Sequence, residues 1–334
     1  MVASSRVGGT GGEALLAAAT RAFLNDEPPA LETVNVRSLD WDWILRRAEA
    51  ERLAPVLYAV FRPLPVPVPK LDRFRTSWVG GRRQHLLGVQ QLCGVLSAFE
   101  REGVPVIPLK GPALGEVLYR DPGLRPFTDL DLLIHAADVP RAISLLSALG
   151  YRHLDIGHSL PYELAWRHAA AFVSAEDRLG RLPIDLHWGL LDYPGIARGP
   201  EIDLEEIWER AVKVDRWDQP ARGLCPEDLL IYLALHWAVH HAFSGLIWRL
   251  DLALLLRRYG GDLDWEAVAQ RARRWRVASA LYFVLRDIEE QLAVGVPVPF
   301  LAGLRPRGPR PRMLEWLRRR ADDRLERLDY LIPV

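Results

Sequence analysis

The chain has 334 residues, enough to bury a large core and to form two or three subdomains. Its 43 basic and 43 acidic residues leave no net charge, so no overall field attracts nucleic acid or a membrane surface. The two cysteines, Cys93 and Cys225, lie far apart, which argues against a disulfide framework or a zinc–thiolate site and indicates a reducing cytoplasm.

Residues 1–102 are predicted to form a helical cap. Residues 1–12 are small and polar and are expected to be a disordered tail. Helical patterns then follow over three ranges: 13–23, 39–61 and 71–102. The first of these is too short and too charged to be a signal peptide or a membrane span. On the third, Arg82, Arg83 and His85 would either approach a nucleotide or lie on a solvated face.

The first functional pattern lies between Val104 and His135. An apolar run predicts a strand that ends at the turn Lys110-Gly111, and Lys110 is one of only three lysines in the chain. Further on, Asp129 and Asp131 are two residues apart in a predicted strand, so both side chains point to the same face. Such a pair either lies on a solvated face or holds Mg²⁺, which binds oxygen ligands and substrate phosphates.

A third carboxylate strengthens the metal interpretation. Residues 168–175 and 181–188 read as a hairpin, and in its second strand Asp185 and His187 share a face. Three carboxylates on neighbouring strands can hold two metal ions about 3.5–4 Å apart, which suits in-line phosphoryl transfer. The Lys110-Gly111 turn and the helix after it would offer backbone N–H groups to the phosphates.

These motifs together resemble a known family. LKGPAL, YRDPGLRPFTDLDLL and IDLHW are similar to the nucleotidyltransferase superfamily of the DNA polymerase β type, and most similar to a bacterial branch known only as nucleotidyltransferase family proteins. The resemblance implies an α+β fold, a mixed sheet with flanking helices. It also implies metal ligands at Asp129, Asp131 and Asp185, and nucleotide contacts at Lys110 and Gly111. The wider superfamily has Gly-Gly or Gly-Ser at this turn, so the lysine is a departure.

The sequence predicts three parts: the helical cap 1–102, a catalytic domain 103–200 and a helical C-terminal domain 201–334. In the last part His236 and His240 are one helical turn apart, but Trp237 stands where a zinc-protease motif needs glutamate. These histidines, like His187, are candidates for substrate contact, and a core role remains the alternative. The arginine-rich C-terminal stretch is interrupted by acidic residues, so nucleic-acid binding is not expected.

The expected reaction is metal-dependent transfer of a nucleoside monophosphate from a nucleoside triphosphate, ATP in the first instance, to a hydroxyl acceptor with release of pyrophosphate. The metal would be two Mg²⁺ ions, with Mn²⁺ as a substitute. Arg125 would neutralise phosphate charge or pair with Asp121. The sequence leaves open a small-molecule, peptide or protein acceptor, and it does not indicate the oligomeric state. Two alternatives remain: a non-catalytic or antitoxin-like module on the same fold, and a kinase-like transfer of the γ-phosphate.

Overall fold

The computed structural model describes residues 5–27, 38–155, 157–175, 180–191, 201–217 and 221–306. The chain forms two compact units. Residues 80–229 make up one of them, and residues 1–79 together with 230–334 make up the other. The long helix α4 (Leu71–Arg101) is predicted almost to the residue, and the unit boundary falls within it. The proposed domain division at residues 103–200 stays a prediction.

The unit 80–229 contains a five-stranded mixed sheet in the order β1-β2-β5-β4-β3. Its strands are β1 (Ile107–Pro108), β2 (Leu130–Leu133), β3 (Tyr151–His153), β4 (Ala169–Ser174) and β5 (Ile184–His187). Strands β2 and β5 are parallel, whereas the other neighbouring strands are antiparallel. The predicted α+β class and the predicted hairpin, β4–β5, are therefore confirmed. The tip of that hairpin, residues 176–179, lies outside the described residues.

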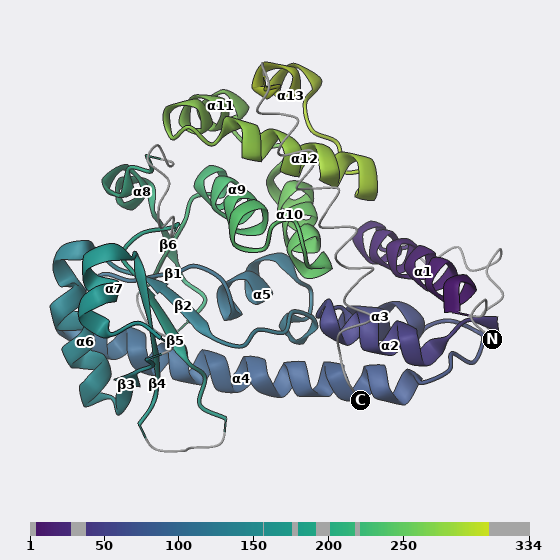
Figure 1. Ribbon diagram of the computed structural model, residues 1–334, viewed down its shortest axis with the longest axis horizontal. Coiled ribbons are helices and arrows are strands. Elements are labelled where there is room, and N and C mark those ends of the chain that lie inside the picture. The colour runs from purple at the N-terminus through teal and green to yellow at the C-terminus, as the bar shows by residue number, and fades with distance from the viewer. Residues whose placement is uncertain are drawn as a thin grey trace. The chain divides into compact units, whose positions relative to one another are not determined.

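Helices connect and cover these strands. They are α5 (Pro112–Leu118), η2 (Pro122–Leu124), η3 (Ala136–Asp138), α6 (Val139–Ala148), α7 (Leu160–Trp166) and α8 (Leu204–Arg210). A separate two-stranded sheet, β6 (Val212–Val214) with β7 (Ala221–Gly223), follows α8 and was not predicted. Figure 1 shows α4 and α6 beside the main sheet.

The two faces of the main sheet differ because side chains alternate along each strand. From β2, Leu130 and Leu132 enter the hydrophobic core, which residues of α4 and α6 complete. From β5, Ile184 and Leu186 enter the same core. The intervening positions, including Asp131 and Asp185, therefore belong to the opposite face, where a polar site can form.

The other unit is helical in its described residues. Its helices are α1 (Ser5–Asn25), α2 (Trp41–Ala50), α3 (Ala54–Phe61), α9 (Pro226–Leu235, mostly in this unit), η4 (His236–His240), α10 (Leu246–Tyr259), α11 (Trp265–Arg274), α12 (Ala278–Leu292) and α13 (Val298–Leu304). Its N-terminal core is aromatic, with Trp41, Phe61 and Phe74 in edge-to-face contacts at centroid distances of 5.8 to 6.5 Å. Such pairs add to the hydrophobic gain from burying the rings.

Two N-terminal predictions need correction. The single helix expected over residues 39–61 is interrupted, because Arg52 adopts a left-handed φ of 57°. Pro55, which lacks a backbone N–H, then lies in the first turn of α3. Helix α1 begins at Ser5, within the stretch that the sequence predicts to be disordered.

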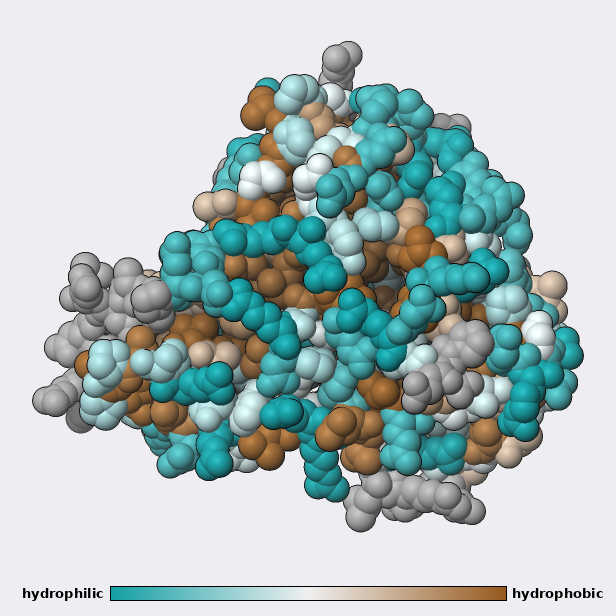
Figure 2. Space-filling model, turned by 180° about the vertical axis from the view of Figure 1, so that it is seen from behind, coloured by the Kyte–Doolittle hydropathy of each residue, from teal (hydrophilic) through white to brown (hydrophobic). Residues whose placement is uncertain are grey.

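No helix among the described residues is long and apolar enough to cross a membrane. On the face shown in Figure 2, hydrophilic residues are interspersed with hydrophobic ones.

Candidate active site

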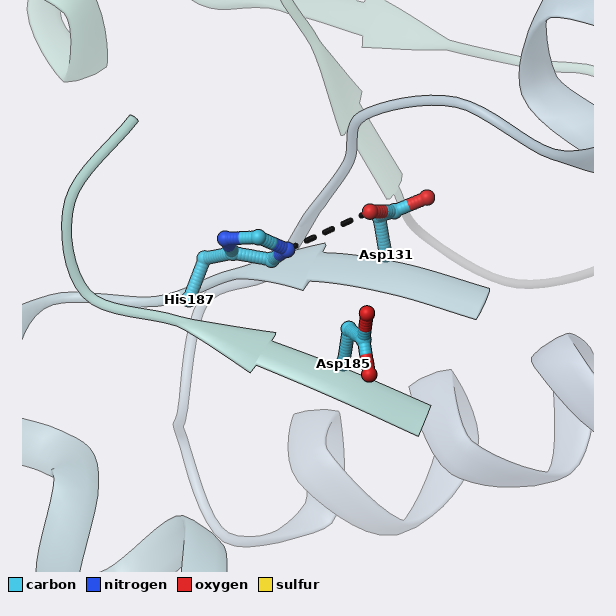
Figure 3. Close-up of side chains that lie close together, drawn as sticks. All are labelled: Asp131, Asp185 and His187. Atoms are coloured by element: carbon cyan, nitrogen blue, oxygen red, sulfur yellow. Dashed lines mark hydrogen bonds and ion pairs between the residues drawn. The ribbon is translucent and has the colours of Figure 1, made fainter. Parts of the chain in front are cut away.

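The parallel pairing of β2 and β5 creates the site. Asp131 pairs in register with Asp185, and Leu133 pairs with His187. Paired residues on adjacent strands point to the same side of a sheet. Figure 3 shows Asp131, Asp185 and His187 on one side of the two strands. One ligand atom from each lies within 4.8 Å of the others, and within the described part of the chain no other group of three metal-binding residues is as close.

Asp131 is the most buried member of the group, with its side chain only 3% exposed. The Lys110 Nζ lies 2.7 Å from Asp131 Oδ1, and the His187 Nε2 lies 3.2 Å from the same oxygen. Burial opposes the charge on Asp131, but the Lys110 ammonium and the His187 hydrogen bond outweigh it, so the pKa of this carboxyl lies below its ordinary value. Asp131 is therefore a stable buried anion.

Asp185 has the opposite electrostatic environment. Burial raises the pKa of Asp185, and the negative charge of Asp131 beside it raises it further, to about 6. The charge of Asp129 contributes in the same direction. The two carboxyls on adjacent strands thus titrate in well-separated pH ranges. A pKa near neutrality suits a group that exchanges protons.

The Lys110-Gly111 turn lies directly beside the start of β2. The Leu109 N–H donates to the Asp131 carbonyl at 3.0 Å. Gly111 has a φ of 54°, and a Cβ placed on it would lie 3.2 Å from the Asp129 carbonyl oxygen. Glycine is therefore required here both by its left-handed conformation and by the close approach of the backbone. The turn holds Lys110 over the acidic pair.

Arg125 also contacts this turn. Its side chain is buried, and Nη1 donates to the Gly111 carbonyl at 3.5 Å. The carboxylate of Asp121 accepts a hydrogen bond from the Gly123 N–H at 3.0 Å and so caps η2. The structure thus supports a bracing contact from Arg125 to the turn, and a phosphate contact stays a prediction.

The structure groups the predicted site residues differently from the sequence. The third member of the close group is His187, whereas the sequence predicts Asp129 as the third member. Asp129 precedes β2 and is half-buried. His236 and His240 belong to the helical unit, where a π-helical turn places the His236 Nε2 3.1 Å from the His241 Nε2. Their substrate role stays a prediction.

His85 was expected at a nucleotide or on a solvated face, and the solvated-face alternative is wrong for it. The side chain is buried in the sheet unit, and its Nε2 lies 3.2 Å from the Glu116 Oε1 of α5. Glu116 is therefore the carboxylate that partners His85 in the structure. No local sequence pattern predicts this pair, because the two residues are 31 positions apart.

Comparison with known proteins identifies the family. The family model described as "uncharacterised nucleotidyltransferase" matches residues 37–292, which is most of the chain. The protein belongs to this nucleotidyltransferase family. It is accordingly a transferase enzyme, and the predicted resemblance is confirmed. The match includes Asp131, Asp185 and His187 as well as the helical residues around His236.

Solved structures with similar chains include two of ANT(2″)-Ia. The crystal structure in complex with adenylyl-2″-tobramycin is 15% identical, with a TM-score of 0.37, and the match covers 57% of this nucleotidyltransferase and 97% of that chain. The solution structure of the same antibiotic-resistance factor is 16% identical, with a TM-score of 0.38. That match covers 61% of this nucleotidyltransferase and 97% of that chain. No curated protein sequence gave a significant match.

Proposed function

We propose that this nucleotidyltransferase moves a nucleoside monophosphate from a nucleoside triphosphate, with ATP as the first candidate, to a hydroxyl group of an acceptor. The observation that carries the proposal is the in-register pair Asp131–Asp185, which places two carboxylates and the Lys110 ammonium at one point of the sheet. Phosphoryl-group transfer is catalysed mainly by positioning and charge neutralisation, and this group of side chains supplies both. A cytoplasmic location remains part of the expectation.

The donor set fits a divalent metal ion. Two carboxylates and an imidazole offer atoms within 4.8 Å of one another, and both carboxylates are largely removed from solvent. We propose that Asp129, Asp131 and Asp185 hold the metal, with Mg²⁺ as the first candidate and two ions as in the related chemistry. When bound, the metal would polarise the transferred phosphoryl group and neutralise its developing charge.

The other roles in the reaction are assigned to side chains and backbone groups of the protein. Lys110 and the Gly111 turn would contact the triphosphate, and Arg125 would keep the turn in place. Asp185 would help to orient the attacking hydroxyl and would accept its proton. The new bond joins the acceptor oxygen to the α-phosphorus. The bond from the α-phosphorus to the bridging oxygen breaks, and pyrophosphate leaves with that electron pair.

The position of a radiolabel tests the reaction. The protein is incubated with α-labelled or γ-labelled ATP, Mg²⁺ and a panel of hydroxyl acceptors that includes polyols, amino sugars and serine peptides. Label transferred from α-labelled ATP, with unlabelled pyrophosphate as the second product, would support the proposal. Label transferred only from γ-labelled ATP would replace it with kinase-like transfer.

A calorimetric titration with ATP tests binding without a known acceptor. Binding that depends on Mg²⁺ is expected for the wild-type protein and should be lost in Asp131→Asn. Absence of ATP binding in the presence and absence of Mg²⁺ would favour a non-catalytic module and would overturn the proposed function.

A further inference from the structure

We propose that His187 is itself a metal ligand, so that the centre combines two carboxylates with one imidazole and prefers Mn²⁺ and later first-row transition metals over Mg²⁺. This inference rests on the proposed function insofar as a divalent ion binds beside Asp131. It goes further by adding a nitrogen donor to a set predicted to be all oxygen and by naming the class of metal. Asp131, Asp185 and His187 would share one ion, in addition to the Asp129 contact proposed above.

Strand geometry places the imidazole for this role. His187 follows Asp185 by two positions in β5, so the two side chains leave the same face of the sheet. The pairing with β2 brings the His187 Nε2 to 3.2 Å from Asp131 Oδ1 (Figure 3). The position of His187 is therefore set by the paired strands β2 and β5 and not by a loop.

The separations match those of ligands on a single ion. Bonds to a divalent metal are about 2.0–2.5 Å long, so two donor atoms on the same ion are at most about 4–5 Å apart. The donor atoms of Asp131, Asp185 and His187 all lie within 4.8 Å of one another. These separations allow all three donor atoms to bind one ion.

Burial keeps most of the solvent away from the donor atoms. The His187 side chain is 16% exposed and that of Asp131 is 3% exposed, so little water competes for the same positions. To bind a metal, Nε2 must present its lone pair, and the ring proton then resides on Nδ1. A nitrogen donor of this kind suits first-row transition metals, whereas Mg²⁺ prefers oxygen ligands and retains its waters.

The competing role for His187 is that of a positioning residue, which would hold Asp131 by a hydrogen bond and never touch the ion. Pulsed electron paramagnetic resonance of the Mn²⁺-loaded protein with a non-hydrolysable ATP analogue separates the two roles. A directly bound imidazole gives a ¹⁴N coupling to the Mn²⁺ spin, and ¹⁵N-labelled histidine changes that signal in a defined way. A histidine that only orients Asp131 gives neither effect.

Three variants sharpen the test. His187→Gln should abolish the ¹⁴N coupling and weaken Mn²⁺ binding by at least about tenfold while changing Mg²⁺ binding much less. His187→Asp replaces nitrogen by oxygen and should shift the preference toward Mg²⁺. His158→Gln, which alters an exposed histidine of the same unit, should retain the coupling and the wild-type ratio of affinities. Circular dichroism and thermal melts establish that each variant is folded.

The outcomes are distinct. A wild-type ¹⁴N coupling that His187→Gln removes and His158→Gln keeps supports the proposal. Mn²⁺ binding without a ¹⁴N coupling overturns it, as does an equal loss of Mn²⁺ and Mg²⁺ affinity in His187→Gln or a complete absence of Mn²⁺ binding. If the coupling is absent but label still passes from α-labelled ATP with Mg²⁺, this inference fails while the proposed function stands.

Discussion

Replacement of Asp185 by asparagine is expected to stabilise the metal-free protein at high pH while abolishing nucleotidyl transfer. Burial and the neighbouring Asp131 charge raise the pKa of Asp185 from 3.8 to about 6, so the folded protein resists ionising this group. An amide of nearly the same shape cannot ionise. The variant therefore lacks the unfavourable free energy of ionising a buried carboxyl beside Asp131.

The size of the effect follows from proton linkage. Between pH 3.8 and about 6 the folded state binds a proton at Asp185 that the unfolded state has lost, so the free energy of unfolding falls as the pH rises through this range. Above about pH 6 both states are ionised and the cost is constant. The shift of about 2 pK units corresponds to roughly 3 kcal/mol at pH 8 and to about 1 kcal/mol at pH 4.5.

Urea unfolding in the presence of EDTA, at pH 8 and at pH 4.5, measures this difference. Asp185→Asn should raise the unfolding free energy clearly more at pH 8 than at pH 4.5. Asp215→Asn, which changes an exposed aspartate of the same unit, serves as the matched control and should shift neither value appreciably. A variant that is no more stable than wild type at pH 8, or equally stabilised at both pH values, would refute the electrostatic reasoning.

Three further predictions concern the site and its support. Asp131→Asn should reduce transfer from α-labelled ATP by at least about a hundredfold with an unchanged circular dichroism spectrum, and normal turnover with Mg²⁺ would make the site assignment wrong. Lys110→Ala should weaken ATP binding about tenfold or more while hardly affecting adenosine, and calorimetry showing equal losses would make Lys110 structural. In α4, Gly80→Ala should raise the unfolding free energy by about 0.5–1 kcal/mol, because nothing lies within 4 Å of the added Cβ. Gly81→Ala should instead lower it by about 1–3 kcal/mol, because its Cβ would lie 2.3 Å from the Gly123 carbonyl oxygen, and chemical denaturation that ranks the two alike would contradict this.

Much of the sheet unit could be predicted because its signals are local. Alternation of polar and apolar residues in LDLL and IDLH identifies β2 and β5 and the face to which Asp131 and Asp185 belong. The family resemblance then supplied the expectation that these strands are neighbours. The exact register, Asp131 beside Asp185, depends on strand pairing across 54 positions of sequence, and no local pattern encodes it.

The contacts that determine the chemistry could not be predicted for the same reason. The ion pair between Lys110 and Asp131 and the approach of His187 arise only when three separate segments meet. The interruption between α2 and α3 is a different case. Pro55 gives a local signal that a helix begins near it. The left-handed conformation of Arg52 accompanies the backbone hydrogen bonds that end α2, from the Arg52 N–H to the Glu49 carbonyl and from the Leu53 N–H to the Ala48 carbonyl, and arginine is not a residue type that predicts it.

Charge balance at the site links Lys110 to Asp185 and gives one more testable consequence. Without a divalent ion, the Lys110 ammonium neutralises Asp131, and Asp185 partly keeps its proton near pH 6. A divalent ion beside both carboxylates would neutralise their negative charge in place of the ammonium and the proton. Lys110 would then be available for the triphosphate. Removal of Lys110 should therefore have opposite effects on the two ligands. In calorimetric titrations, Lys110→Ala should bind the metal more tightly than wild type in the absence of nucleotide, although it binds ATP more weakly. Weaker binding of both would mean that Lys110 supports the fold of the site and does not exchange with the ion.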